Sequence, residues 1–162
     1  MYLLPKPKTI KEQEGQMLLC HSTQIVMSKE VAETEMHAAK RLQEAIRQET
    51  GLILPFSVGE VREGDLSLGI AKTLPEQTYE ITIDEKGGQI SGGDGAGVLY
   101  GVETFCQIVQ QCGGILPCVQ IQDAPDMPNR GYYFDQTRGR VLKLEELKKI
   151  ADRMSRYKLN QL

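Results

Sequence analysis

A run of proline and acidic residues at 123–129 divides the sequence and limits how its last part can fold. It reads Asp-Ala-Pro-Asp-Met-Pro-Asn, which is typical of a linker. Residues 131–134 are then strand-like, and a loop, a helix and a second apolar run at 159–162 follow, which indicates the beginning of a parallel βαβ series. A parallel strand needs neighbours on both edges and layers on both faces. We therefore expect two domains, 1–123 and 124–162, with the second truncated inside a longer protein.

The periodicity before the linker predicts an α+β domain. Apolar residues at steps of three and four predict a helix over 29–49, with Ser28 as its N-cap and Gly51 just beyond its end. Short apolar runs predict five or six mostly antiparallel strands. These runs lie at 23–27, 52–56, 66–70, 79–83, 89–91 and 118–121. We expect an antiparallel or mixed sheet with two helices on one face.

The most glycine-rich stretch, residues 91–97, opens the second predicted helix. Asp94 is the expected cap of that helix. A glycine-rich loop ahead of a helix can bind phosphate. This stretch, however, lacks the spacing of a P-loop or a dinucleotide fingerprint, and Asp94 would repel an anion. We expect the glycines to let the helix approach the sheet closely, and we expect no cofactor.

The charge balance argues against a nucleic-acid partner. The chain has 19 Lys+Arg and 22 Asp+Glu, a net charge of -3, and it has no basic block. No apolar run approaches the roughly 18 residues that cross a bilayer, and the N-terminus lacks the apolar core of a signal peptide. We expect no membrane partner and a cytoplasmic chain as given, with a secreted form left open.

The cysteine spacing predicts free thiols and no metal site, because it matches neither a Cys-x-x-Cys motif nor a zinc knuckle. Two of the cysteines flank a Gly-Gly turn, so a disulfide between them in an oxidising compartment is the alternative. The four are Cys20, Cys106, Cys112 and Cys118, and the flanking pair is Cys112 and Cys118.

Polar side chains gather where the predicted strand at 131–134 ends. They are Asp135, Thr137, Arg138 and Arg140, with Arg130 just ahead of the strand. Loops at the C-terminal ends of parallel strands carry the active sites of β/α folds, so these residues are candidates for a binding site. A purely structural ion pair or cap formed by Asp135 and Arg138 is the alternative.

Several segments, in the same order, resemble glycoside hydrolase family 20, the β-N-acetylhexosaminidases. Residues 123–131, DAPDMPNRG, then 135–138, DQTR, and 157–160, YKLN, are similar to the start of that family's catalytic barrel. Residues 95–104, GAGVLYGVET, resemble a helix start in its non-catalytic N-terminal domain. The resemblance implies an α+β domain followed by the truncated start of a (β/α)8 barrel, with 124–162 as the first barrel strand and helix.

The resemblance also implies an enzyme that removes terminal N-acetylhexosamine from glycans by a retaining, substrate-assisted mechanism. In this mechanism the sugar's acetamido oxygen is the nucleophile, a Glu is the general acid and an Asp orients the acetamide. That Asp-Glu pair belongs to a later barrel strand, so no catalytic residue is expected in this chain. Arg130 would bind hydroxyls of the terminal sugar, since a guanidinium can hold two vicinal oxygens. Asp135 and Arg138 are secondary candidates for substrate contact.

One segment departs from the family pattern. Members commonly read Asp-x-Ser-Arg-His here, whereas residues 135–139 read Asp-Gln-Thr-Arg-Gly. Thr137 keeps a hydroxyl, but Gly139 removes an imidazole that could donate hydrogen bonds. A divergent branch that acts on another hexosaminide therefore stays open.

Two further expectations concern the chain by itself. Its alternative function is that of a non-catalytic scaffold or a carbohydrate-contacting module, since one barrel strand cannot build an active site. Its tail would leave large side chains exposed, each forgoing roughly 1.5–3 kcal/mol of burial, and would leave a strand edge unpaired. We expect the chain to self-associate through residues 131–162, or to fold that segment back on the α+β domain.

Overall fold

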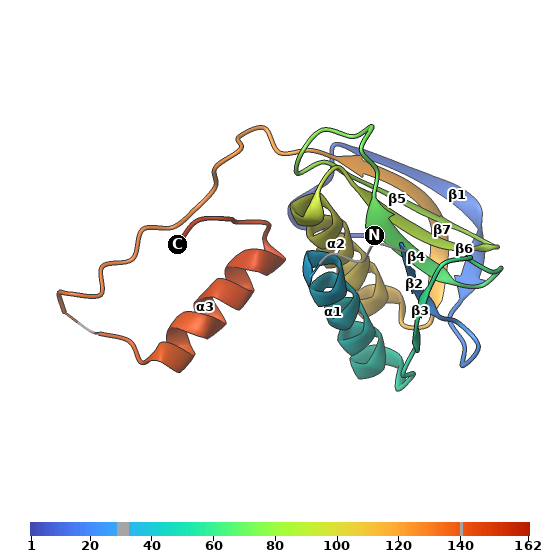
Figure 1. Cartoon of the computed structure of the whole chain (residues 1–162), viewed down its shortest axis with the longest axis horizontal. Coiled ribbons are helices and arrows are strands. Elements are labelled where there is room, and N and C mark those ends of the chain that lie inside the picture. The colour runs from blue at the N-terminus through green and yellow to red at the C-terminus, as the bar shows by residue number, and fades with distance from the viewer. Residues whose placement is uncertain (29–32, 140) are drawn as a thin grey trace. The chain divides into compact units, whose positions relative to one another are not determined.

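The computed structural model describes residues 1–28, 33–139 and 141–162, which form two compact units. The first unit is Met1–Pro125 and the second is Asp126–Leu162. Among the described residues, the first unit contains a seven-stranded sheet and two helices, and the second contains one helix (Figure 1).

The sheet of the first unit has the strand order β1-β7-β5-β6-β4-β2-β3. Its strands are β1 (Thr9–Leu18), β2 (Ile25–Met27), β3 (Phe56–Val58), β4 (Leu66–Ile70), β5 (Tyr79–Asp84), β6 (Gly87–Gly92) and β7 (Ile115–Asp123). The pairs β3–β2, β2–β4 and β4–β6 are parallel, whereas β6–β5, β5–β7 and β7–β1 are antiparallel. A mixed sheet is thus confirmed, but the expectation of mostly antiparallel strands is wrong. The helix between β2 and β3 returns the chain to the same end of the sheet, which makes that pair parallel.

β1 is the strand that the sequence patterns did not predict. Its residues, TIKEQEGQML, are mostly polar and exposed, so no apolar alternation identifies it. It pairs with β7 at the edge of the sheet, from Thr9 opposite Gln122 to Leu18 opposite Ile115 (Figure 1). Charged side chains are common on such edge strands because they discourage pairing with another chain.

The strand expected at 52–56 is displaced towards the C-terminus, since β3 begins only at Phe56. Leu54 is fully buried, and the Pro55 carbonyl accepts a hydrogen bond from the Ile25 N–H at 2.9 Å. Proline has no N–H to give to a strand ladder, which explains why residues 52–55 do not extend the sheet. The other expected strands are confirmed as β2, β4, β5, β6 and β7, with β7 longer than expected.

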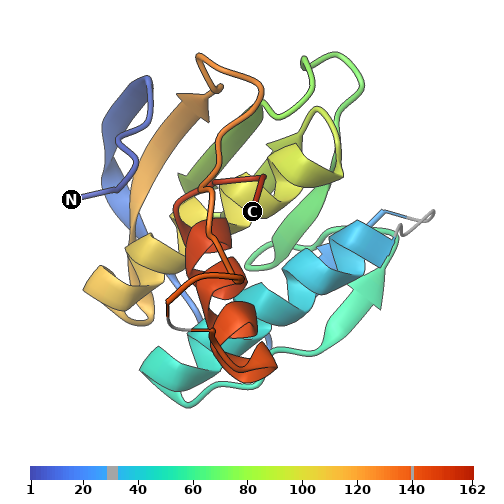
Figure 2. The same cartoon turned by 90° about the vertical axis from the view of Figure 1, so that its left-hand side faces the viewer.

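Two helices, α1 (Glu33–Thr50) and α2 (Gly95–Cys112), lie on one face of the sheet, as expected (Figures 1 and 2). Ala39, Leu42 and Ile46 of α1 are fully buried, at the spacing of one helix face. They join the inward side chains of α2 and of the strands in one apolar core.

The C-terminal end of α1 is also as expected. Gly51 follows the helix with a φ of +76°, which favours glycine, and its N–H donates to the Arg47 carbonyl at 2.9 Å. The expected start of this helix at Lys29, with Ser28 as its cap, involves residues 29–32, which lie outside the described residues.

The glycine-rich stretch brings α2 against the sheet, as expected. Asp94 caps the helix, because its Oδ1 accepts the Gly97 N–H at 2.7 Å and also the Gln77 N–H at 2.9 Å. A side chain at Gly97 would collide with the Thr78 carbonyl, and one at Gly92 would collide with the Val98 nitrogen. The start of the helix is therefore filled by the chain's own carboxylate and backbone, which leaves no place there for a phosphate.

We predict that Asp94→Ala lowers the free energy of unfolding by about 1–2 kcal/mol, because two N–H groups lose their acceptor. Urea denaturation followed by circular dichroism measures the change. Asp94→Asn is the matched control, since its amide oxygen still caps a helix. If Asp94→Ala is as stable as the unmodified chain, the cap contributes nothing to the fold.

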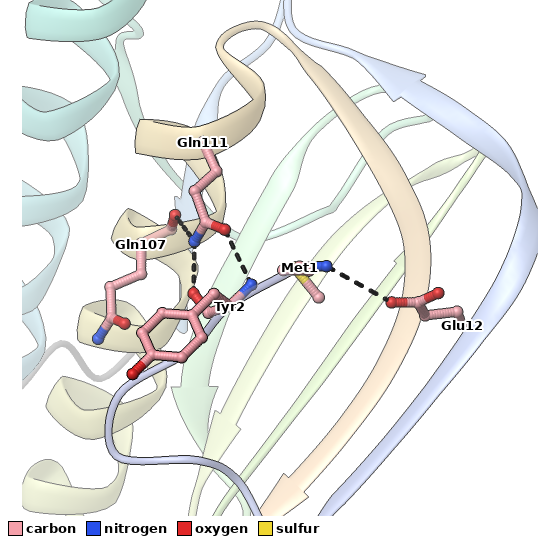
Figure 3. Close-up of polar contacts among 5 residues, drawn as sticks. All are labelled: Met1, Tyr2, Glu12, Gln107 and Gln111. Carbon is pink, nitrogen blue, oxygen red and sulfur yellow. Dashed lines mark hydrogen bonds and ion pairs between the residues drawn. The ribbon is translucent and has the colours of Figure 1, made fainter.

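The N-terminal segment is fastened to α2 by two glutamine side chains, and Figure 3 shows one of them, Gln111, with its bonds to Tyr2. Gln111 accepts the Tyr2 N–H at 2.9 Å and donates to the Tyr2 carbonyl at 2.6 Å. Gln107 makes the same pair of hydrogen bonds with Leu4, both at 2.8 Å. Because each amide satisfies one backbone donor and one acceptor, residues 2–4 are held without a strand ladder.

The second unit contains α3 (Leu144–Arg156), which confirms the third predicted helix. The strand expected at 131–134 does not form; the described contact there is a single parallel bridge between Gly131 and Gln161. The run at 159–162 likewise forms no strand. A pair of short parallel segments offers few backbone hydrogen bonds, so strong β propensity at Tyr132 and Tyr133 does not by itself produce a ladder.

All four cysteines are free thiols, which agrees with the favoured expectation rather than the Cys112–Cys118 disulfide. No group of three or more His, Cys, Asp or Glu side chains that could hold a metal ion occurs in the part of the chain that the structure describes. None of the helices among the described residues has the length and apolar character needed to cross a membrane.

Candidate functional site

Arg130, the leading site candidate, lies half-buried at the start of the second unit, where its guanidinium contacts backbone oxygens. Its Nε donates to the Lys158 carbonyl at 2.9 Å, and its Nη1 donates to the carbonyls of Met127 at 2.6 Å and Pro128 at 3.3 Å. Arg130 thus holds two segments of the second unit together. Its expected contact with sugar hydroxyls stays a prediction.

Asn160 completes this clamp from the opposite segment. Its Oδ1 accepts the Arg130 N–H, and its Nδ2 donates to the Pro128 carbonyl, both at 2.8 Å. The Arg130 carbonyl accepts the N–H groups of Asn160 and Gln161 at 2.7 and 3.1 Å, and the Tyr132 N–H donates to the Gln161 carbonyl at 3.0 Å. These bonds place the chain before α3 and the chain after it side by side and parallel, as the start of a βαβ unit requires.

Asp135 shapes the loop that follows. Its Oδ1 accepts the Thr137 N–H at 2.7 Å and the Thr137 hydroxyl at 2.6 Å. Hydrogen bonds from the Thr137 side chain, and then from its backbone, hold the pKa of Asp135 below its usual value. The carboxylate is exposed and ionised, so it is available to a ligand as an acceptor while it caps its own turn.

Arg138, the other secondary candidate, is exposed. Within residues 126–139 and 141–162, no ion pair joins Arg138 to Asp135, so the structure does not support the alternative of a structural ion pair. It supports the alternative of a cap, because Asp135 accepts hydrogen bonds from Thr137. Arg140 lies outside the described residues. The Gln136 Oε1 accepts the Leu142 N–H at 3.2 Å, which ties the end of this loop to the segment before α3.

The first unit carries a buried polar network at the end of β7, just before the linker. The Tyr79 hydroxyl donates to Asp123 Oδ2 at 3.0 Å and lies 2.8 Å from the Thr104 hydroxyl. Burial, and then the Asp123 carboxylate, raise the pKa of Tyr79 well above its usual value. Asp123 also accepts the Lys8 N–H at 3.3 Å, so the network fixes where the chain leaves the sheet.

Sequence reasoning missed the parts of the second unit that act through the main chain. In the sequence Asn160 stands out only as part of a family-like segment, and its bonds to residues 128–130 have no local signal. The carbonyls that accept from Arg130 could not be foreseen either, because every residue type presents the same backbone oxygen.

The first unit matches a known protein family. The profile of glycosyl hydrolase family 20, domain 2, matches residues 1–124. The chain belongs to glycosyl hydrolase family 20. The matched range holds the seven-stranded sheet with α1 and α2, so this fold is the family's domain 2.

Curated relatives carry the name of one enzyme. A beta-hexosaminidase of Porphyromonas gingivalis is 29% identical over 171 residues, covering 98% of this chain and 22% of the relative. A beta-hexosaminidase of Vibrio furnissii is 29% identical over 160 residues, covering 98% of this chain and 25% of the relative. The chain therefore spans about a quarter of the length of these relatives.

Solved structures share the fold. The chitobiase of Flavobacterium johnsoniae matches with a TM-score of 0.84 and 21% identity, over 98% of this chain and 26% of that one. The family 20 beta-N-acetylhexosaminidase of Streptomyces coelicolor matches with a TM-score of 0.82 and 20% identity, over 98% of this chain and 33% of that one. Both alignments continue past residue 124 into the second unit.

Proposed function

We propose that this chain is domain 2 and the first barrel strand and helix of a β-N-acetylhexosaminidase. The complete enzyme removes terminal N-acetylhexosamine from glycans by substrate-assisted, retaining hydrolysis. The chain by itself is non-catalytic, because the Asp-Glu pair that this mechanism needs belongs to a later part of the enzyme.

The observation that carries the proposal is the continuous likeness to family 20 enzymes across both units. The beta-hexosaminidases of Porphyromonas gingivalis and Vibrio furnissii align with 98% of this chain. The fold match with solved family 20 enzymes has the same extent. A free-standing domain 2 would align over the first unit alone.

The geometry of the second unit supports its assignment to a barrel. The segments before and after α3 run parallel and are joined by the Gly131–Gln161 bridge and the Arg130–Asn160 bonds. In a (β/α)8 barrel each strand is followed by a helix that returns the chain to the next parallel strand. Neighbouring strands on both edges would then supply the ladder that residues 131–134 lack here.

Hydrolysis of aryl glycosides by the full-length protein tests the proposal. We expect release of para-nitrophenol from para-nitrophenyl N-acetyl-β-glucosaminide or from para-nitrophenyl N-acetyl-β-galactosaminide. The matched β-glucoside lacks the acetamido nucleophile, so its kcat/KM should be at least about a hundredfold lower. Equal turnover of the β-glucoside would contradict the substrate-assisted mechanism. If none of these aryl glycosides is hydrolysed, the proposed hexosaminidase activity is wrong.

The proposed role of Arg130 in the full-length enzyme gives a second prediction. Arg130→Ala should lower kcat/KM by about tenfold to a hundredfold, because hydrogen bonds from a charged donor to substrate contribute about 1.5–3 kcal/mol. Steady-state kinetics and urea denaturation of the same preparation separate substrate binding from folding.

Asn160→Ala is the matched control for this prediction, because it breaks the same clamp and leaves the guanidinium in place. If Arg130 holds the sugar, Arg130→Ala loses much more kcat/KM than Asn160→Ala. Equal losses of stability and of kcat/KM in the two variants would show that Arg130 acts only as the structural clamp.

Self-association of the 162-residue chain is a further prediction. The second unit exposes large apolar side chains, including Tyr132 at 56%, Tyr133 at 91% and Leu144 at 64%. Apolar surface of this kind favours association. We expect sedimentation velocity to show a dimer of the 162-residue chain and a monomer of a chain ending at Pro125. Monomers in both samples across the micromolar range would contradict tail-driven association.

A further inference from the structure

The face of the sheet opposite α1 and α2, called here the outer face, carries a row of small and uncharged polar side chains. Strand alternation sends Leu66, Ile81 and Ile90 to the core, so their neighbours point outward. Three of these neighbours lie side by side on adjacent strands, because Thr82 of β5 pairs with Gln89 of β6, which pairs with Ser67 of β4.

The loop between β3 and β4, residues 59–65, forms a wall along this row. Its backbone is fixed at both ends, with the Gly59 N–H donating to the Met27 carbonyl at 3.2 Å and the Gly64 N–H donating to the Lys86 carbonyl at 2.7 Å. The wall is therefore held in place before any ligand arrives.

A buried carboxylate braces the same loop from within. Asp65 is 3% exposed, and its two oxygens accept the Gln24 N–H at 3.0 Å and the Arg62 N–H at 2.9 Å. Between these anchors Val61 remains 54% exposed. A rigid loop thus presents an apolar side chain at the rim of a polar row.

Two adjoining hollows occupy the space beside this wall, with volumes of about 280 Å³ and 180 Å³. Both are lined by Val61, Ser67 and Gln89, so they form one groove across β4, β6 and β5. The charged residues of the smaller hollow are Asp84 and Lys86, which are opposite in charge, and the buried Asp65, whose oxygens accept two backbone N–H groups. The larger hollow is close to the lower size limit of small-molecule sites.

The lining combines polar side chains with apolar residues, which in the larger hollow include Val61 and Ile70. Hydroxyl and amide groups both donate and accept hydrogen bonds, which suits a molecule with many hydroxyls. The lining has no basic cluster that would favour an anion, and the acidic residue beyond the Asp84–Lys86 pair, Asp65, is buried. The three strands are interior strands whose backbone groups already pair with their neighbours, so a peptide cannot bind here as an added strand.

We propose that this groove binds a neutral oligosaccharide, with Gln89, Ser67 and Thr82 contacting its hydroxyls and Val61 contacting the apolar face of a sugar ring. The choice of a β-linked N-acetylglucosamine disaccharide as the probe rests on the proposed function. The groove lies wholly within the first unit.

A titration of the isotope-labelled 162-residue chain with N,N′-diacetylchitobiose, followed by amide chemical shifts, tests this proposal. We expect saturable shifts of the amides of Val61, Ser67 and Gln89, with a Kd of about 1 mM. Gln89→Ala and Val61→Ser should each weaken binding by about fivefold or more.

Gln120→Ala is the matched control. Gln120 is an exposed glutamine on β7, directly beyond Thr82, and it does not line either hollow. Its replacement should leave the Kd unchanged. Amide chemical shifts that do not saturate, or that are largest outside the groove, would overturn the proposal. Weakening of disaccharide binding by Gln120→Ala to the same extent as by Gln89→Ala would also overturn it. Failure of the aryl glycoside assay, by contrast, would bear on the proposed function and leave a measured Kd standing.

Discussion

Gly97→Ala is expected to destabilise the first unit by more than about 3 kcal/mol, or to prevent it from folding. The added methyl group would collide with the Thr78 carbonyl and press on Gly92. Both neighbours are backbone atoms, and Gly97 also donates to the Asp94 cap, so the helix cannot move away without losing that bond. Urea denaturation of the 162-residue chain measures the loss.

Gly114→Ala is the control for this prediction. A side chain there would meet Thr50 at 3.6 Å and the Leu19 carbonyl at 3.8 Å, which is ordinary packing distance. We expect a change of less than about 1 kcal/mol, mostly from the backbone. If the two alanine variants have the same stability, the close approach of α2 to the sheet is not what requires glycine at position 97.

Arg41→Ala is expected to cost about 3 kcal/mol, because it leaves a carboxylate buried without its cation. Arg41 of α1 forms an ion pair with Glu103 of α2, and the Glu103 side chain is only 4% exposed. The pair crosses the interface between the two helices that cover the sheet. Chemical denaturation of the single variant gives the cost directly.

The double variant Arg41→Met with Glu103→Leu separates charge from packing. A buried ion pair can often be replaced by apolar side chains of similar volume with little loss. We therefore expect the double variant to regain most of the stability that Arg41→Ala loses. A double variant as unstable as the single one would mean that packing at this contact, rather than the unpaired carboxylate, causes the loss.

The elements that the sequence predicted are those with a local signal. The helix ends at Asp94 and Gly51 follow from capping and from a positive φ, and β4 and β5 follow from strict alternation. β1 has no such signal, since its polar residues become a strand only through pairing with β7. Strand direction is also a property of the whole sheet, so the sequence patterns predict mostly antiparallel strands although three of the six strand pairs are parallel.

The same distinction explains the candidate site. Arg130 and Asp135 could be selected from the sequence because they precede and follow a strand-like run. Their partners could not, because Arg130 donates to backbone carbonyls and Asp135 turns back onto Thr137. The groove on the outer face combines side chains of β4, β5 and β6. That these side chains are neighbours follows from the strand order, which the sequence patterns do not reveal.

The proposed assignment is that the chain contributes a non-catalytic domain and the start of a barrel to a β-N-acetylhexosaminidase. It is tested most directly by assaying the full-length protein and the 162-residue chain side by side on para-nitrophenyl N-acetyl-β-glucosaminide and on its galactosaminide counterpart. We expect the full-length protein to turn over at least one of the two substrates, and the 162-residue chain to release para-nitrophenol no faster than buffer alone. Turnover by the 162-residue chain that a substitution within it abolishes, or no turnover of either substrate by the full-length protein, would rule out this assignment.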